Sequence, residues 1–170
     1  MTGTTGRSAA KTMRAYRMII PLMAAWLIAG CSSEVVSTAH RDLPEAGWDV
    51  TDTIVLPIEV NDTAMTYDLA ITLRHTDKYP YQNIWFFMQT ADGRRDTVLA
   101  MLADDRGQWL TTRAGRYYSG YVVAERNVRF DSTGIQEVRI VHGMRDERLQ
   151  GVADVGIEVR RQTAALTDKR

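Results

Sequence analysis

The sequence predicts an all-β fold, an antiparallel β-sandwich of jelly-roll-like type. Short apolar segments with period-two alternation recur between residues 53 and 160, about 8–15 residues apart, and turn-forming residues separate them. No segment beyond residue 30 shows the periodicity of an amphipathic helix. The length of 43–161 predicts a single β-sandwich domain.

The first four expected strands are 53–60, 67–74, 84–90 and 96–102. Pro57 has no backbone donor, which predicts that the first of them is an edge strand or carries a bulge. The dense apolar run of 84–90 predicts a central strand, with Trp85 in the core. Asp92-Gly93 favours positive φ and so predicts the tight hairpin that joins 84–90 to 96–102.

Four further strands are expected at 117–123, 128–130, 135–142 and 154–160. In the last of them Val155, Ile157 and Val159 recur at a spacing of two residues, which predicts one buried face. Residues 162–170 are mostly polar, and we expect them to form a disordered tail.

Cys31 is the single cysteine, and its position predicts a lipid anchor. A basic segment, the 13-residue apolar run from Met18 to Gly30 and small residues before a cleavage point are typical of a secretory signal peptide. The run is shorter than the ~20 residues that a membrane span needs. Leu27-Ile28-Ala29-Gly30-Cys31 resembles a bacterial lipobox. We therefore expect 1–30 to be a helical lipoprotein signal peptide and Cys31 to carry the acyl chains, palmitate among them; the start codon is left open.

The mature chain is expected to be mildly acidic. Four of the 21 basic residues precede Cys31 and all 21 acidic residues follow it, so the formal charge from Cys31 onward is −4. This charge disfavours nucleic acid and anionic lipid as partners, which leaves the acyl chains to attach the protein to a membrane. Residues 31–42 show no apolar periodicity and are expected to be a flexible tether. No aspartate follows Cys31 directly, which by analogy favours the outer membrane, facing the periplasm, over the inner membrane.

Signatures of catalysis are missing from the sequence. There is no Gly-x-Ser-x-Gly elbow, phosphate loop or paired-histidine metal motif, so we expect no enzymatic activity, no cofactor and no metal. Two less favoured kinds of site stay open. His75 and His142 each end a strand and, with Asp77 or Asp146, could form a metal site. Asp131 with Asp146 or Glu147 could form the carboxylate pair of a glycoside hydrolase.

Aromatic residues concentrate in the middle of the chain and are the best candidates for binding. Tyrosine and tryptophan are favoured at protein interfaces and on sugar-binding platforms. We expect Tyr79, Tyr81, Trp109 and Arg145 to contact a partner. Packing in the sandwich core is the alternative explanation for the aromatic residues.

Several short motifs follow the lipobox in a characteristic order: Leu43-Pro44-x-x-Gly47-Trp48, Asp77-Lys78-Tyr79-Pro80-Tyr81-Gln82-Asn83-Ile84, Gly107-Gln108-Trp109-Leu110, Asn127-Val128-Arg129-Phe130, His142-Gly143-Met144-Arg145 and Gly151-Val152-Ala153-Asp154-Val155-Gly156. Together they resemble the gliding motility lipoprotein GldH family, over residues 31–160. The resemblance implies a non-enzymatic component of the bacterial gliding machinery, which is linked to a protein-secretion apparatus, and it implies other machinery proteins as partners. A surface carbohydrate-binding lipoprotein is the alternative function.

Overall fold

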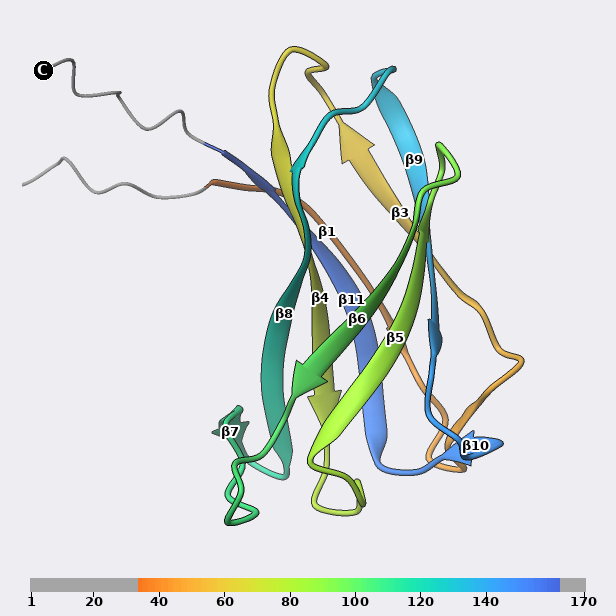
Figure 1. Cartoon of the computed structure of the whole chain (residues 1–170), viewed down its shortest axis with the longest axis vertical. Helices are drawn as coiled ribbons and strands as arrows, with labels where there is room; N and C mark the ends of the chain where they lie inside the picture. The colour runs from red at the N-terminus through yellow and green to blue at the C-terminus, as the bar shows by residue number, and fades with distance from the viewer. Residues whose placement is uncertain (1–33, 163–170) are drawn as a thin grey trace, which may run out of the picture. The chain divides into compact units, whose positions relative to one another are not determined.

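The computed structural model describes residues 34–162, which form two antiparallel sheets packed face to face (Figure 1). A five-stranded sheet has the order β1-β11-β4-β8-β7, a four-stranded sheet has the order β3-β9-β5-β6, and β10 pairs with β2. The strands are β1 (Glu34–Asp42), β2 (Trp48–Asp49), β3 (Ile54–Val60), β4 (Tyr67–His75), β5 (Asn83–Thr90), β6 (Arg95–Met101), β7 (Thr112–Ala114), β8 (Tyr117–Val128), β9 (Gly134–His142), β10 (Arg148–Leu149) and β11 (Val152–Arg161). The predicted all-β sandwich is confirmed. No helix within residues 34–162 is long and apolar enough to cross a bilayer.

The predicted strands of the four-stranded sheet agree closely with the structure. β3, which contains Pro57, is an edge strand, and β5 lies between β9 and β6. The expected hairpin joins β5 to β6: Gly93 has a φ of +85°, its N–H donates to the Thr90 carbonyl over 2.9 Å, and the Thr90 N–H donates to the Arg94 carbonyl over 3.0 Å.

The strand predicted at 117–123 extends further, as β8 from Tyr117 to Val128, and the separate strand predicted at 128–130 does not form, since Arg129 and Phe130 lie outside any strand. The register between β4 and β8 shifts near Leu69, which marks an irregularity in β8 between Val123 and Val128. Asn127 adopts a positive φ of 57°, and its N–H donates to the Asp68 carboxylate over 3.1 Å. This local kink explains why the sequence pattern breaks within the strand.

The prediction that residues 31–42 are a flexible tether is wrong for the part that the structure describes. Residues 34–42 form β1, which pairs with β11 from Glu34 opposite Arg161 to Asp42 opposite Asp154. Backbone hydrogen bonds to β11 hold this edge strand in the sheet, so its sequence can form a strand with little apolar periodicity. The expected signal peptide, Cys31 and the end of the tail lie outside the described residues.

The core lies between the two sheets and is built from alternate residues of each strand. β3 shows the pattern most clearly, with Ile54, Leu56, Ile58 and Val60 buried and the residues between them exposed. The expected core position of Trp85 is wrong, because its side chain is 39% exposed on the outer face of β5. The core instead receives Ile84, Phe86 and Met88 from this strand.

Candidate functional site

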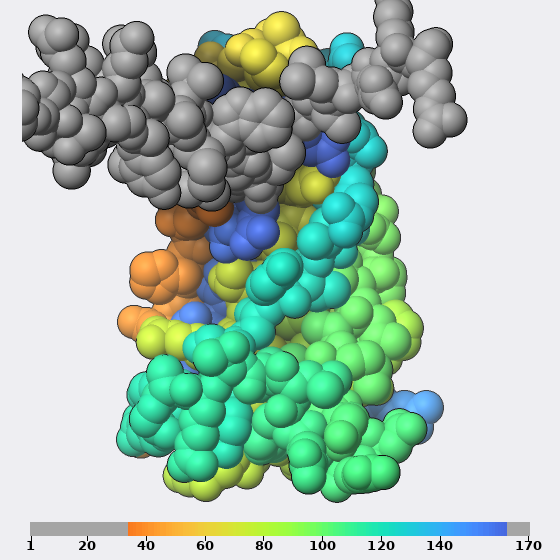
Figure 2. All heavy atoms as spheres, turned by 90° about the vertical axis from the view of Figure 1, so that its left-hand side faces the viewer, coloured from red at the N-terminus to blue at the C-terminus, as the bar shows by residue number. Residues whose placement is uncertain are grey.

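The four residues predicted to contact a partner come from three loops at one end of the sandwich. Tyr79 and Tyr81 lie between β4 and β5, Trp109 between β6 and β7, and Arg145 between β9 and β10. The strands β4, β6 and β9 all run toward this end, so their following loops meet there (Figure 1). In the space-filling view, β7 and the loop before it form the lower part of the face shown (Figure 2).

Tyr79 is buried beneath this end and does not reach its surface. Its side chain is 2% exposed, and its hydroxyl donates to the Asn83 carbonyl over 2.7 Å. Burial is the main cause that raises the pKa of the Tyr79 phenol above its ordinary value. The expected partner contact therefore fails for Tyr79, which instead holds the loop against the core.

An aromatic cluster surrounds the buried His75. Its ring centroid lies 4.5 Å from that of Trp109, 5.3 Å from that of Tyr118 in a stacked arrangement, and 5.6 Å from that of Tyr79. Trp109 is half-buried in this cluster and packs against the core. The structure thus brings Trp109 and Tyr79 together, as members of one packed cluster.

Tyr81 and Arg145 are the two predicted residues with exposed side chains. Tyr81 is 38% exposed, packs edge-on against Tyr79 with centroids 5.9 Å apart, and donates its hydroxyl to the Asp146 carboxylate over 2.8 Å. The hydrogen bond to Asp146 is the main cause that raises the pKa of the Tyr81 phenol. Arg145 precedes Asp146 in the chain, so the bond ties the loop of Tyr81 to the loop of Arg145.

The two histidines considered for a metal site are each engaged elsewhere. His75 donates through Nδ1 to the Thr76 carbonyl (3.1 Å), and its Nε2 accepts from the Thr111 hydroxyl (3.3 Å). His142 donates through Nε2 to the Trp48 carbonyl (3.2 Å), and its ring lies edge-on to that of Trp48. Burial lowers the pKa of both histidines and keeps them neutral near pH 7. Among residues 34–162 no cluster of three potential metal ligands occurs.

The glycosidase pair also lacks the required geometry in the described part of the chain. Asp131 precedes β9 and Asp146 follows it, so the two carboxylates lie at opposite ends of a nine-residue strand. That separation is far larger than the ~5–10 Å of a glycosidase pair. The rings of His75 and Tyr118 are stacked and His75 is buried, so this pair offers no open sugar platform.

A patch that the sequence did not predict lies on the outer face of the four-stranded sheet. We name it the β5–β6 patch; its members are Trp85 (39% exposed), Phe87 (50%), Leu99 (38%) and Met101 (50%). Trp85 lies directly opposite Leu99 in the antiparallel pair, so the side chains form one continuous surface. Contiguous exposed apolar surface containing tryptophan and phenylalanine is typical of a protein interaction site.

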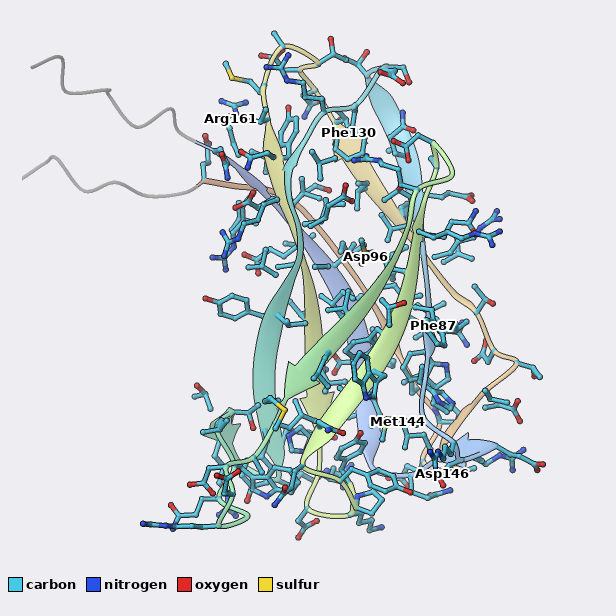
Figure 3. The ribbon with its side chains drawn as sticks, viewed as in Figure 1. Phe87, Asp96, Phe130, Met144, Asp146 and Arg161 are labelled. Atoms are coloured by element: carbon cyan, nitrogen blue, oxygen red, sulfur yellow. The ribbon has the colours of Figure 1, made fainter. Side chains whose placement is uncertain are left out.

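The loop after β9 supports the patch from one side. The Gly143 N–H donates to the Trp85 carbonyl over 2.7 Å, and the Trp85 N–H points to the Met144 sulfur at 3.5 Å. A Cβ atom on Gly143 would lie 3.0 Å from the Phe87 ring, so the Phe87 ring packs closely over the backbone of Gly143. Figure 3 shows Phe87, Met144 and Asp146 in succession along this side of the sandwich.

Arginines border the patch. Arg95 and Arg139 lie in one cross-strand row, on either side of Gln89. This row and the neighbouring Phe87 and Val141 line a shallow groove of about 700 Å³. The arrangement offers apolar contact flanked by guanidinium groups, and tryptophan and arginine are enriched among the residues that dominate protein interfaces.

Comparison with known proteins gives a family and a relative that spans nearly the same length. The model of the family described as GldH lipoprotein matches residues 35–159. The Gliding motility lipoprotein GldH of Flavobacterium johnsoniae is 24% identical over 158 residues, covering 86% of this chain and 98% of that protein. A solved structure of AlgX from Pseudomonas aeruginosa is similar with a TM-score of 0.39 and 14% identity, covering 79% of this chain and 29% of that chain.

Proposed function

Because the chain belongs to the GldH lipoprotein family, we propose that it is a lipid-anchored, non-enzymatic component of the bacterial gliding-motility machinery that acts by docking other machinery proteins. One observation carries this proposal: the family match spans 35–159, nearly the whole of the described domain. The proposed function is therefore assigned to the sandwich domain. The proposal includes a link to the secretion apparatus with which gliding is associated.

The anchor in this proposal is Cys31. A diacylglyceryl group on the thiol and a further acyl chain on the new N-terminus give the two or more chains that stable membrane attachment requires. The protein then remains in the cell envelope, on the periplasmic face of the outer membrane. The mildly acidic mature chain supports this arrangement, since it offers little electrostatic attraction to lipid.

The proposed role without catalysis is supported by the geometry of the polar groups. The ring nitrogens of His75 that could act in proton transfer both have hydrogen-bond partners, and His142 is buried behind Trp48. Docking needs none of these groups. We propose that Tyr81 and Arg145 contact a machinery protein, while Tyr79 and Trp109 hold their loops in place from beneath.

The test of this function is made in the gliding host with the full chain. Replacing Cys31→Ala should abolish incorporation of labelled palmitate, release the mature domain from the membrane fraction and stop cell movement. Ser33→Ala is the matched control, two residues away, and should leave labelling and movement intact. If cells whose only copy is the Cys31→Ala protein incorporate no palmitate into it and still glide normally, anchoring is unnecessary for gliding.

A further inference from the structure

We propose that the β5–β6 patch is the surface on which this protein docks a partner protein, one with an apolar centre and carboxylates around it. The inference rests on the proposed docking function and deepens it by assigning the surface and the chemistry of the partner. It moves the main contact from the loops at the end of the sandwich to the adjacent outer face of the four-stranded sheet.

The composition of the patch supplies the first argument. Trp85, Phe87, Leu99 and Met101 are large apolar side chains with 38–50% of their surface exposed. Tryptophan, phenylalanine, methionine and arginine are enriched at protein interfaces, and a few such anchors supply most of the binding energy. The alternate residues of β5 already fill the core on its opposite face, since Ile84 and Phe86 are completely buried. The exposed rings are therefore not required by the core.

The charges beside the patch determine what kind of partner it fits. Arg139 is paired with Glu137 over 3.0 Å, and Asp96 accepts a hydrogen bond from the N–H of Thr97. Arg95 and Arg145 have no ion pair with any described residue. Arg95 follows the β5–β6 turn and Arg145 follows Met144, so a guanidinium group without an ion pair among the described residues lies near each end of the patch. Carboxylates on a partner would complement it.

The same charges disfavour a second copy of this chain as the occupant. In a two-fold symmetric dimer each patch meets an identical patch, and the bordering groups meet identical borders. Arg95 and Arg145 of one copy would then approach arginines of the other, which costs energy when the surface is desolvated. A heterologous acidic partner avoids this repulsion.

The length of chain before β1 argues against the bilayer as the occupant. Cys31 is three residues from Glu34, so an acylated Cys31 holds the start of β1 within about 11 Å of the anchor point. The start of β1 lies beside Arg161 and Tyr67, at the end of the sandwich opposite the loop of Met144. A nine-residue strand spans roughly 30 Å. The anchor therefore keeps the Arg161 end of the domain close to the membrane and the Met144 loop at the other end, away from it. Trp85 and Met101, which lie nearest the Met144 loop, are then the part of the patch farthest from the membrane.

Site-specific photocrosslinking in living cells tests the proposal. A photoreactive amino acid is placed at Phe87 or at Met101 in the full chain, and the crosslinked peptides are identified by mass spectrometry. We expect both positions to couple to the same heterologous protein, at a segment that contains aspartate or glutamate. The matched control is Ile135 in β9, which belongs to the same four-stranded sheet and is 67% exposed. It lies beyond the row of Arg95 and Arg139 and should give no such adduct.

Two variants then test the chemistry of the contact. With the crosslinker at Met101, Phe87→Ser should lower the adduct yield about tenfold or more, as expected for loss of an interface anchor. Arg95→Glu should lower it as well, whereas Ile135→Ser should not. Thermal unfolding of the purified variants checks that each remains folded, and a variant with a native melting temperature but reduced adduct supports the proposal.

Three results would overturn the inference. An adduct between two copies of the chain would identify a homodimer surface, and an adduct with lipid alone would identify a membrane contact. An unchanged adduct in folded Phe87→Ser or Arg95→Glu protein would show that the patch is not the docking surface. If these variants glide normally while Cys31→Ala stops gliding, this inference fails and the proposed function stands.

Discussion

The Tyr81 hydroxyl donates to the Asp146 carboxylate over 2.8 Å and so joins the loop after β4 to the loop after β9. The two residues are 65 positions apart in the sequence. Met144, two residues before Asp146, contacts the backbone of Trp85. The bond therefore helps to position one border of the β5–β6 patch, although neither residue belongs to the patch.

A titration of the Tyr81 phenol reports this bond. Its pKa is raised because the phenolic proton is shared with the Asp146 carboxylate, whose negative charge also opposes formation of the phenolate. Asp146→Asn should lower the Tyr81 pKa toward the ordinary tyrosine value. The measurement is NMR of protein with labelled tyrosine rings, in which Tyr81→Phe assigns the signal. An identical Tyr81 titration in Asp146→Asn protein would contradict the bond.

Falling pH should destabilise the domain through His142. Burial is the main cause that lowers its folded pKa below the ordinary 6.5, although donation to the Trp48 carbonyl and the charges of Asp146 and Asp49 oppose the shift. The unfolded chain therefore binds a proton before the folded one does. The stability that the neutral His142 contributes is present above pH 6.5 and is lost as the pH falls through the folded pKa. His75, whose pKa is also lowered by burial, adds to the same trend.

Urea unfolding between about pH 7.5 and pH 5 measures the effect of these histidines. We expect the midpoint to fall with pH in the native chain. His142→Gln retains an N–H that can reach the Trp48 carbonyl but cannot titrate, so its midpoint should depend less on pH. The Nδ1 atom of His142 is buried without a hydrogen-bond partner, so protonation there gains nothing to offset desolvation. An equally steep pH dependence in the variant would exclude His142 as the source.

The limits of sequence-based prediction are clearest in β5. The run from Ile84 to Met88 is apolar at every position, so it has no alternation that would show which face is covered. It correctly predicted an internal strand but placed Trp85 in the core. Which face meets the second sheet is decided by pairing with β9 and β6, and this information lies far from β5 in the sequence.

The loop containing Tyr79 illustrates a second limit. Pro80 favours an extended residue before it, and this correctly indicates a loop. The sequence does not show that the loop folds back so that the Tyr79 hydroxyl reaches the Asn83 carbonyl. The sequence nevertheless placed Tyr81 in a loop and Arg145 just after a strand, and strand direction alone brings these two segments to the same end of the sandwich.

Substitution of Gly151 should be strongly destabilising. Its φ is +81°, and an added Cβ atom would lie 2.3 Å from the backbone nitrogen of Tyr79. Gly93 is the matched control, with a φ of +85° but nothing within 4 Å of such an atom. We expect Gly93→Ala to cost about 1 kcal/mol from backbone strain alone, and Gly151→Ala roughly 3 kcal/mol because the backbone contact adds to it. Denaturant unfolding measures both, and equal losses would contradict the close approach between Gly151 and the Tyr79 loop.

Hydrogen exchange should distinguish a paired β1 from the flexible tether that the sequence predicts. Within β1, His40 lies opposite Gly156 and Asp42 lies opposite Asp154 in an antiparallel ladder, so alternate amides donate to β11. Those amides should exchange at least about a hundredfold more slowly than a free peptide, which corresponds to an opening free energy of about 3 kcal/mol. The amide of Asp105, an exposed residue of the turn between β6 and β7, serves as a fast-exchanging control.

The result for β1 also decides how the domain is held. Slow exchange from Val35 onward would leave only Ser32, Ser33 and Glu34 between an acylated Cys31 and the slowly exchanging sheet, which fixes the Arg161 end of the domain toward the bilayer. Exchange at free-peptide rates through Asp42 would lengthen the reach to roughly 40 Å and let the domain turn freely. A photoreactive residue at Phe87 could then reach the bilayer and crosslink to lipid. Slow exchange of β1 is therefore a condition for the membrane-distal position of the β5–β6 patch.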